Sequence, residues 1–498
     1  MINSKPDRKY DFLFTKVDFN IVERSIEIDE VEIIPLDSVS NSFVKGKVDV
    51  AYLSGINLKK LVLEKDLTLE KLKFINADFV IHHKAGESKK KASDHELKSL
   101  FGDILSRGLL EEFQIEKGSA LILDEGKEIG YLKRLDILAT GLVTDSLVWN
   151  NMIPFKYDRI SLHIDSLFYD LQGQQVNLGK FTFDTAEDKV KFENLSFTYS
   201  ESLEKASQKM QFQTDLINVE LDSMVFMGLE SNSRFQSDLD VRADKLTVAG
   251  LNLKDFRNKS KPRPKDEIKP MFQGMLQKVN FPLKLDSLIL VNGHIAYSEN
   301  VPEKGESWEL HWTELNGHIV NVTTIPEFQN QLEHFDASVK GKVKGEGILD
   351  FKLKVPYDKE AFNLEVELKN FDLTTLNSTM KPIMNGDVTS GHMDRLKLVI
   401  KATEASAHVD MIFDYKDLKV EMFNKKGEKK NIFSSTAANL ALNHSNLPGE
   451  KKYVHPSFLM QRNRSRGPFY LIWQSTKEGM LKIVPGGAVK TILKSAEK

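Results

Sequence analysis

The feature that most constrains the fold is a strand-like alternation of apolar residues that shifts by one position at its centre. Residues 283–300, LKLDSLILVNGHIAYSEN, carry apolar side chains at Leu288 and Leu290 and again at Ile295 and Tyr297. Alternate residues of a strand share a face, so the odd step between the two pairs would turn the second pair to the opposite face. A residue that absorbs the step, as in a β-bulge, keeps all four on one side and bends the strand.

The same spacing recurs elsewhere, which allows two explanations of the shift to be compared. Asn292-Gly293 alone is typical of a two-residue hairpin turn, because both central residues of that turn need positive φ. The equivalent dipeptides Asn76-Ala77 and Asp165-Ser166 lack the glycine, so we favour a bulge within one long strand. The apolar positions of the two closest copies are Leu69, Leu72, Phe74, Phe79 and Ile81, and Phe113, Ile115 and Ile122.

Strand signals along the chain follow one another and do not alternate with helical periodicity. The alternation is clearest between residues 336 and 421. This order disfavours a parallel sheet built from βαβ units. We therefore predict a mostly β fold, an elongated and strongly curved antiparallel sheet that forms a β-groove, with a few accessory helices.

Changes in composition divide the chain into four predicted regions. Residues 1–257 form N-terminal β-groove repeats with a helix inserted near 95–107, and the Pro-rich, charged stretch 258–270 is a flexible linker. Residues 271–430 form a second β-groove region, which opens with a short helix from Met271 to Lys278. Residues 431–498 form a helical tail that carries basic and aromatic side chains.

Composition and motif searches exclude several classes of function. The 69 basic and 72 acidic side chains nearly cancel, so no basic field exists to attract nucleic acid. The absence of cysteine excludes disulfides, thiolate zinc ligands and a cysteine nucleophile. The chain has no phosphate-binding loop, dinucleotide fingerprint, HExxH or GxSxG motif. We therefore predict a protein that is not an enzyme and has neither a metal site nor a cofactor.

Two groups of polar residues could instead indicate an enzyme or a metal site. The carboxylate pairs Asp215/Glu220 and Glu365/Glu367 lie at strand spacing, where a glycosidase could use them, but outward strand positions are commonly acidic. We interpret them as solvent-facing residues. His294, His311 and His318 are spread over separate strands, which disfavours a shared metal ion.

The C-terminal tail combines positive charge with aromatic side chains. Pro468 opens a helix that Pro485 ends. Cations beside aromatic anchors are attracted to anionic membrane surfaces, so we predict contact with a membrane or with an envelope protein. The alternative is a helix docked on the sheet with its arginines in solvent. The predicted contact residues are Arg462, Arg464, Arg466, Phe469, Tyr470 and Trp473, and the predicted apolar helix face is Phe469, Ile472, Trp473, Thr476 and Met480.

Residues 369–424 resemble the C-terminal part of the AsmA-like envelope proteins. The matching positions in this stretch are an Asp-Leu-x-x-Leu-Asn step, a turn containing Pro and Gly, and a Ser-Gly before a long strand. The repeat beginning at Leu288 and the tail from Arg462 are similar to that family as well. The residues that carry the resemblance are Asp372, Leu373, Leu376, Asn377, Pro382, Gly386, Ser390 and Gly391, then Leu288, Leu290, Gly293, Ile295 and Tyr297, then Arg462, Tyr470, Trp473 and Gly479.

The resemblance implies a bridge-like lipid-transfer protein, whose apolar groove carries the acyl chains of phospholipid or another lipid and supports outer-membrane lipid homeostasis. It also implies a periplasmic location with an inner-membrane anchor in a full-length form, and nothing before Asp11 has the character of that anchor. The expected groove lining is Leu69, Leu72, Phe74, Phe79, Ile81, Phe113, Ile115, Ile122, Leu288, Leu290, Ile295 and Tyr297.

The same sequence pattern is compatible with a structural role. The curved sheet could close on its own core and act as a scaffold or assembly protein that binds a protein partner at a sheet edge. Alternation does not separate an open apolar face from a closed one, because the pattern is the same in both.

Overall fold

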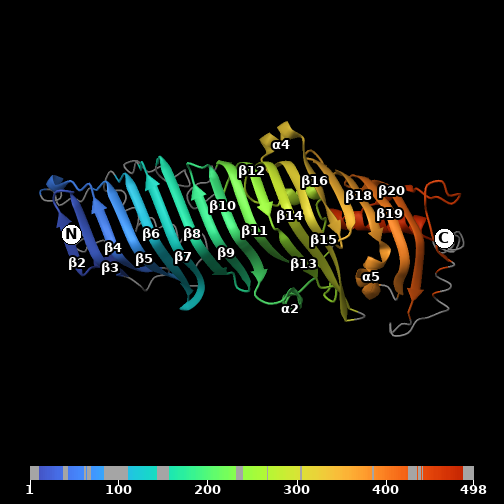
Figure 1. Cartoon of the computed structure of the whole chain (residues 1–498), viewed down its shortest axis with the longest axis horizontal. Helices are drawn as coiled ribbons and strands as arrows, with labels where there is room; N and C mark the ends of the chain where they lie inside the picture. Colours follow the sequence, from blue (N-terminus) through green and yellow to red (C-terminus); the bar gives the residue numbers. More distant parts are fainter. Residues whose placement is uncertain are drawn as a thin grey trace. The chain divides into compact units, whose positions relative to one another are not determined.

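The protein is mostly β, as the alternation predicts (Figure 1). In the computed structural model, strands dominate the described part of the chain and helices are few and short. The predicted helix near 95–107 lies outside the described residues, and so does most of the stretch 424–440. The structure describes residues 10–36, 43–60, 63, 69–83, 110–142, 156–230, 239–265, 267–302, 305–383, 386–423, 435, 439 and 441–485.

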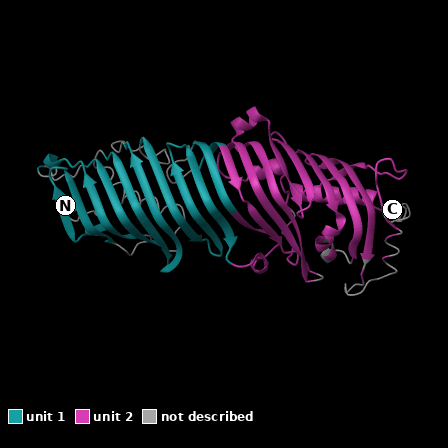
Figure 2. Cartoon of the chain, in the orientation of Figure 1, with its two compact units in different colours: residues 1–200, 221–244 teal, residues 201–220, 245–498 magenta. Residues whose placement is uncertain are grey.

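The chain divides into two compact units (Figure 2). Unit 1 comprises residues 1–200 and 221–244, and unit 2 comprises residues 201–220 and 245–498. The boundary falls within two strands, β11 (Asp215–Glu230) and β12 (Val241–Ala249). The predicted linker 258–270 belongs to unit 2, where Lys269 N donates to Arg464 O at 2.8 Å.

Unit 1 is built from strands that pair with their neighbours in chain order, except that β1 and β2 both pair with β3. All described pairs from β3 to β10 are antiparallel except β5 with β6, which run parallel. A parallel pair needs a long connection, and residues 84–111 supply its length. The strands are β1 (Tyr10–Leu13), β2 (Lys16–Asn20), β3 (Ser25–Pro35), β4 (Phe43–Ser54), β5 (Lys71–His83), β6 (Glu112–Asp124), β7 (Lys127–Thr140), β8 (Arg159–Asp170), β9 (Gln174–Asp184) and β10 (Lys189–Tyr199).

Unit 2 contains an antiparallel meander from β14 to β20, with β13 parallel to β14 and β21 beside β20. Its strands are β13 (Asn252–Arg257), β14 (Leu283–Val301), β15 (Glu306–Thr323), β16 (His334–Val343), β17 (Gly347–Pro356), β18 (Phe362–Asp372), β19 (Gly386–Ala402), β20 (Ser406–Met422) and β21 (Ser457–Gln461). Its helices are α2 (Leu203–Gln208), α3 (Phe272–Leu276), α4 (Pro326–Leu332), η3 (Leu373–Leu376), α5 (Asn377–Ile383) and α7 (Pro468–Ile483).

Two of the three predicted bulges are present and lie inside long strands, whereas Asp165-Ser166 has neither a positive φ nor a register shift. Asn292 has φ 51° within β14, where the register with β15 shifts on both sides of Gly293. Asn76 in β5 has φ 51° and Lys117 in β6 has φ 53°. A residue in this left-handed region turns the chain so that apolar side chains before and after it share a face. The bulge interpretation is confirmed for these strands, and the hairpin alternative at Asn292 is wrong.

Polar side chains on neighbouring strands hold the bulged backbone in place. Asp136 Oδ1 accepts the Lys117 N–H at 2.7 Å, and Asn316 Oδ1 accepts the Asn292 N–H at 3.0 Å. These bonds satisfy donors that the bulge removes from the strand ladder. Other strands have the same positive-φ backbone, and an odd step between apolar residues marks them too, as at Phe192 and Leu195 around Asn194. Further non-glycine residues with positive φ within strands are Glu30, Arg134, Asn194, Glu314, Asn321, Asn370 and Asp417.

The core of unit 2 lies between the sheet and helix α7, the red helix that crosses behind β18 to β20 in Figure 1. The helix begins at Pro468, which sits in its first turn as predicted. Its buried face carries two small residues, so the helix axis comes close to the sheet: a Cβ on Gly479 would collide with the side chain of Met411. The buried face is Leu471, Ser475, Gly479 and Ile483.

Candidate functional site

The apolar side chains of unit 1 line up across its strands. Phe79 of β5 is in register with Ala120, which is in register with Leu132, and the row continues without a break through β10. Residues in register on neighbouring strands project to the same face. Three such rows run across β5 to β10: Phe74, Ile115, Ile137, Leu162, Phe183, Val190; Phe79, Ala120, Leu132, Leu167, Leu178, Leu195; and Ile81, Ile122, Gly130, Tyr169, Val176, Phe197.

We call the surface formed by these three rows, together with Phe181 and Phe192 on the same side of β9 and β10, the apolar face of unit 1. Its rows run perpendicular to the strands, and six strands at ~4.8 Å spacing give a strip about 24 Å long. Many of its large side chains are only partly buried. In the described part of unit 1, no helix longer than a single turn is present to cover them. The partly exposed side chains are Leu162, Leu167, Phe181, Phe192, Leu195 and Phe197.

Aromatic contacts order the centre of this face. The rings of Phe181 and Phe192 lie 4.9 Å apart, and those of Phe192 and Phe226 lie 6.5 Å apart. Such pairs contribute about 0.5–1.5 kcal/mol beyond the area they bury, so the face keeps a defined shape although it is partly exposed.

The predicted lining residues of unit 1 fall on this face, but not all of them are accessible. Leu72, Phe74, Phe79, Ile81, Phe113, Ile115 and Ile122 are brought together in register by β5 and β6. Leu69, Leu72 and Ile115 are buried within the hydrophobic core of β3 to β7. These three are core residues, which corrects the prediction that they line an open groove.

The predicted lining residues of unit 2 also share a face. Leu288, Leu290, Ile295 and Tyr297 of β14 are in register with Ile319, Gly317, Trp312 and Leu310 of β15. All four β14 side chains are partly exposed. Tyr297 also packs edge-on against Trp308, with ring centroids 5.7 Å apart. We call the surface formed by these residues of β14 and β15 the apolar face of unit 2.

The same face is closed farther along unit 2. Val409 and Met411 of β20 are 0% exposed, beneath α7. Phe272 of α3 packs on both Phe362 of β18 and Phe469 of α7, with centroids 5.2 and 5.3 Å away. Between β18 and β20 the apolar residues therefore form an ordinary core, as the scaffold alternative expects.

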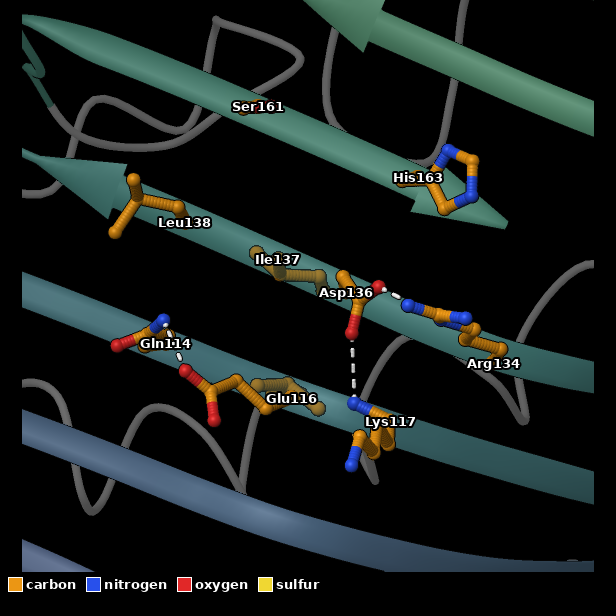
Figure 3. Close-up of a pocket in the computed structure, with 10 residues that line it drawn as sticks. Gln114, Glu116, Lys117, Arg134, Asp136, Ile137, Leu138, Ser161 and His163 are labelled. Atoms are coloured by element: carbon orange, nitrogen blue, oxygen red, sulfur yellow. Dashed lines mark hydrogen bonds and ion pairs between the residues drawn. The ribbon is translucent and has the colours of Figure 1, made fainter. Parts of the chain in front are cut away.

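A shallow polar depression lies on the opposite surface of unit 1 (Figure 3). Its volume is about 350 Å³ and it spans β6 to β8. Asp136 accepts hydrogen bonds from Lys117 N at 2.7 Å and Arg134 Nε at 3.4 Å, and His163 contacts Asp165 at 2.8 Å. These contacts pair the acidic groups with donors. Among the described residues, no group of three or more His, Asp or Glu side chains could hold a metal ion.

The carboxylate pairs singled out in the sequence are engaged by partners on neighbouring strands. Asp215 is bound by Arg257, and Glu220 accepts from Asn252 Nδ2 at 2.7 Å. Glu365 pairs with Lys397 at 2.8 Å and Glu367 with Arg395 at 2.7 Å. Each carboxylate thus has a cross-strand partner, which explains its position without a catalytic role.

The three tail arginines have different environments. Arg462 is 7% exposed and donates to the backbone carbonyls of Glu404, at 3.1 Å, and Lys269. Its assignment to a contact surface is corrected, because its guanidinium is used inside unit 2. Arg464 pairs with Glu404 at the surface, and Arg466 lies over the Tyr470 ring at 5.4 Å.

Helix α7 turns an apolar stripe away from the sheet. Phe469 is 65% exposed and Trp473 is 50% exposed, whereas Ile472 and Met480 pack against the core. The residues of the predicted helix face therefore do not share one environment. The side of the helix that carries the small residues Ser475 and Gly479 packs against the sheet, and Phe469 and Trp473 lie on the opposite side. None of the helices in the described ranges is long and apolar enough to span a bilayer.

Sequence reasoning missed a charged cluster on the apolar face of unit 2. Its members are Asp255, Arg257 and Lys259, with Asp215 and Glu299 as partners. Burial, reinforced by the nearby Asp215 carboxylate, raises the pKa of Asp255 to about 7. The available signal was the placement of Asp255 and Arg257 at alternate positions after Leu253 in one strand.

The raised pKa of Asp255 predicts a pH-dependent stability. A carboxyl in the unfolded chain has a pKa near ~3.9, so between about pH 4 and pH 7 the folded state holds a proton that the unfolded state has lost. Stability therefore falls as pH rises through this window. Because Asp255 is partly exposed, we expect Asp255→Asn to increase the free energy of unfolding by about 1–2 kcal/mol at pH 8 and to change it little at pH 4.5. Urea unfolding followed by tryptophan fluorescence measures both values, and an equal effect at the two pH values would contradict the assignment.

The comparisons with known proteins give no assignment. The sequence matches no protein-family model and no curated protein.

Proposed function

We propose that the protein binds and shields lipid acyl chains along its apolar faces and carries out no chemical reaction on them. The observation that carries this proposal is the partly exposed set of large side chains across β8 to β10. Burying apolar area is worth ~25 cal/mol per Å², so an acyl chain laid on this strip gains several kcal/mol without a specific contact. Monomeric proteins rarely leave a large contiguous apolar patch in water, and such patches mark binding surfaces.

The direction of the rows supports a chain-like ligand. Phe79, Leu167 and Leu195 stand in one row that crosses the strands. Positive-φ residues in β5, β6, β7 and β10 keep apolar residues on this face on both sides of the bend. A long flexible apolar molecule fits a strip of this kind better than a compact one. In line with the AsmA-like resemblance, we propose a phospholipid as the cargo and a bacterial envelope as its setting.

The scaffold function is the second candidate, and the closed core of unit 2 favours it. Val409 and Met411 have no exposed surface beneath α7, so the core of this region is closed by the chain itself. The candidates differ in unit 1, where the scaffold function needs no occupant on the apolar face.

Native mass spectrometry of the full chain purified from a bacterial envelope separates the two functions. Lipid binding predicts adducts with phospholipid masses that detergent exchange removes and added phospholipid restores. The scaffold function predicts protein free of adducts before and after addition. Absence of adducts in both samples would overturn the lipid-binding proposal.

A further inference from the structure

A charged cluster lies on the apolar face of unit 2, beside the predicted lining residues. The register pairs Asp215 with Arg257 and Ile217 with Asp255, and it places Asp255 beside Tyr297. Paired positions share a face, so the cluster continues the surface formed by Leu253 and Ile295 one step nearer the strand ends. Ile217, in register with Asp255, is 38% exposed. Charged and apolar surfaces therefore meet at this point.

Most groups in the cluster have partners of opposite charge. Arg257 Nε donates to Asp215 Oδ1 at 2.5 Å, and a second guanidinium nitrogen binds the other oxygen of that carboxylate. Lys259 Nζ lies 3.1 Å from Glu299 Oε1, and the Tyr297 hydroxyl donates to the same Glu299 carboxylate. These contacts hold two cations and two carboxylates in a fixed arrangement.

Asp255 is the exception within this arrangement. Its Oδ1 atom is buried and has no hydrogen-bond partner among the described residues. With Asp255 ionised, this cluster of described residues holds the carboxylates Asp215, Asp255 and Glu299 and the cations Arg257 and Lys259, so three negative charges less two positive charges leave −1. A partly buried carboxylate without a donor is unfavourable, and one ammonium group would supply both the missing charge and the missing hydrogen bond.

Every phospholipid carries a phosphate, so a phospholipid that satisfies Asp255 needs an ammonium in its head group as well. Its ammonium would meet Asp255, its phosphate would lie near Lys259 and Arg257, and its acyl chains would follow the apolar residues from Ile217 and Ile295. We propose that the cluster is a head-group site for a zwitterionic lipid that carries a phosphate and a primary ammonium, as in phosphatidylethanolamine. This inference rests on the proposed acyl-chain binding and names the class of cargo.

The chemistry distinguishes this head group from its common relatives. A primary ammonium donates hydrogen bonds to a carboxylate, whereas the quaternary ammonium of phosphatidylcholine has no N–H to donate. The head group of phosphatidylglycerol is anionic and would add a negative charge to a cluster that already has an excess of one. Selectivity then comes from one matched contact together with one repulsion.

The test is competition between lipids with identical acyl chains on the full-length chain. An equimolar mixture of phosphatidylethanolamine, phosphatidylcholine and phosphatidylglycerol is added at pH 8, and the adducts are counted by native mass spectrometry. We expect the ethanolamine lipid to exceed each of the others about tenfold, the effect of one charge-assisted hydrogen bond. Asp255→Asn is expected to reduce this ratio to nearly one while total lipid occupancy remains.

Two controls make the outcomes distinct. Asp286→Asn changes an exposed carboxylate of β14 that pairs with Lys284, and it should leave the ratio unchanged. Soluble O-phosphoethanolamine should compete only at millimolar concentration, because it lacks acyl chains. Equal binding of the three lipids to the wild-type protein, or a ratio that Asp255→Asn does not change, would overturn the head-group site alone. Absence of any lipid adduct would overturn the proposed function, and competition by soluble O-phosphoethanolamine at the lipid's own concentration would assign the cluster to a free zwitterion.

Discussion

Phe192→Asp is expected to remove bound lipid from the apolar face of unit 1 while the protein stays folded. The Phe192 ring is partly exposed and contacts Phe181 and Phe226, so the new carboxylate can hydrate at the surface and the loss of stability should be about 1–2 kcal/mol. An acyl chain crossing the same position would have to desolvate the charge, which costs several kcal/mol. Lipid occupancy by native mass spectrometry and melting by circular dichroism measure the two effects separately.

A matched substitution under α7 is expected to give the opposite result. Met411→Asp places a carboxylate at a position with no exposed surface, against Gly479, where no cation is available among the described contacts. An unpaired buried charge costs about 4 kcal/mol or more, so unit 2 should unfold or melt far earlier. Thr198→Asp, on the other face of the strand that carries Phe192, controls for added charge. Equal collapse of the Phe192→Asp and Met411→Asp variants would show that the face of unit 1 is closed as well.

The sequence contained enough information to predict the class of the fold and its bulges. The odd step within the repeats predicted bulges at Asn76-Ala77 and Asn292-Gly293, and the structure has positive φ at Asn76 and Asn292. Periodicity together with Pro468 predicted α7, and a short apolar stretch after Met271 predicted α3. These are local signals, carried by spacing and by residues with restricted backbone conformations.

Other features of the fold and of the site depend on contacts between residues that are distant in the sequence, and a local sequence pattern does not predict such contacts. The alternation of apolar residues is the same for parallel and antiparallel strands, so it could not predict that β5 and β6 pair in parallel. The buried side of α7 was misjudged because Ser475 and Gly479 pack tightly by being small, whereas a periodicity argument favours large residues such as Trp473. Whether an apolar face is open or covered depends on a helix that is distant in the sequence. For the same reason the unpaired carboxylate of Asp255 could not be predicted.

The apolar stripe of α7 is expected to bind an anionic membrane surface. Phe469 and Trp473 project from the helix opposite its buried face, and Arg464, Arg466 and Lys477 lie close to them along the chain. Burying an aromatic side chain in a bilayer interface is worth about 1.5–3 kcal/mol, so the double variant Phe469→Ser and Trp473→Ser should weaken binding to phosphatidylglycerol liposomes about 100-fold. Flotation with liposomes of graded anionic content measures this change.

Point variants are the appropriate test of this surface, because removing residues 462–484 would uncover Val409, Met411 and the rest of the core beneath α7. Such a deletion would confuse lost folding with lost binding. The matched control is Leu459→Ser. Leu459 is an exposed apolar residue on the face of β21 that points away from α7, and this variant should bind liposomes like the wild-type protein. If the double variant keeps its wild-type affinity while its melting temperature is unchanged, the exposed stripe of α7 has no role at the membrane and the helix serves only to close the core of unit 2.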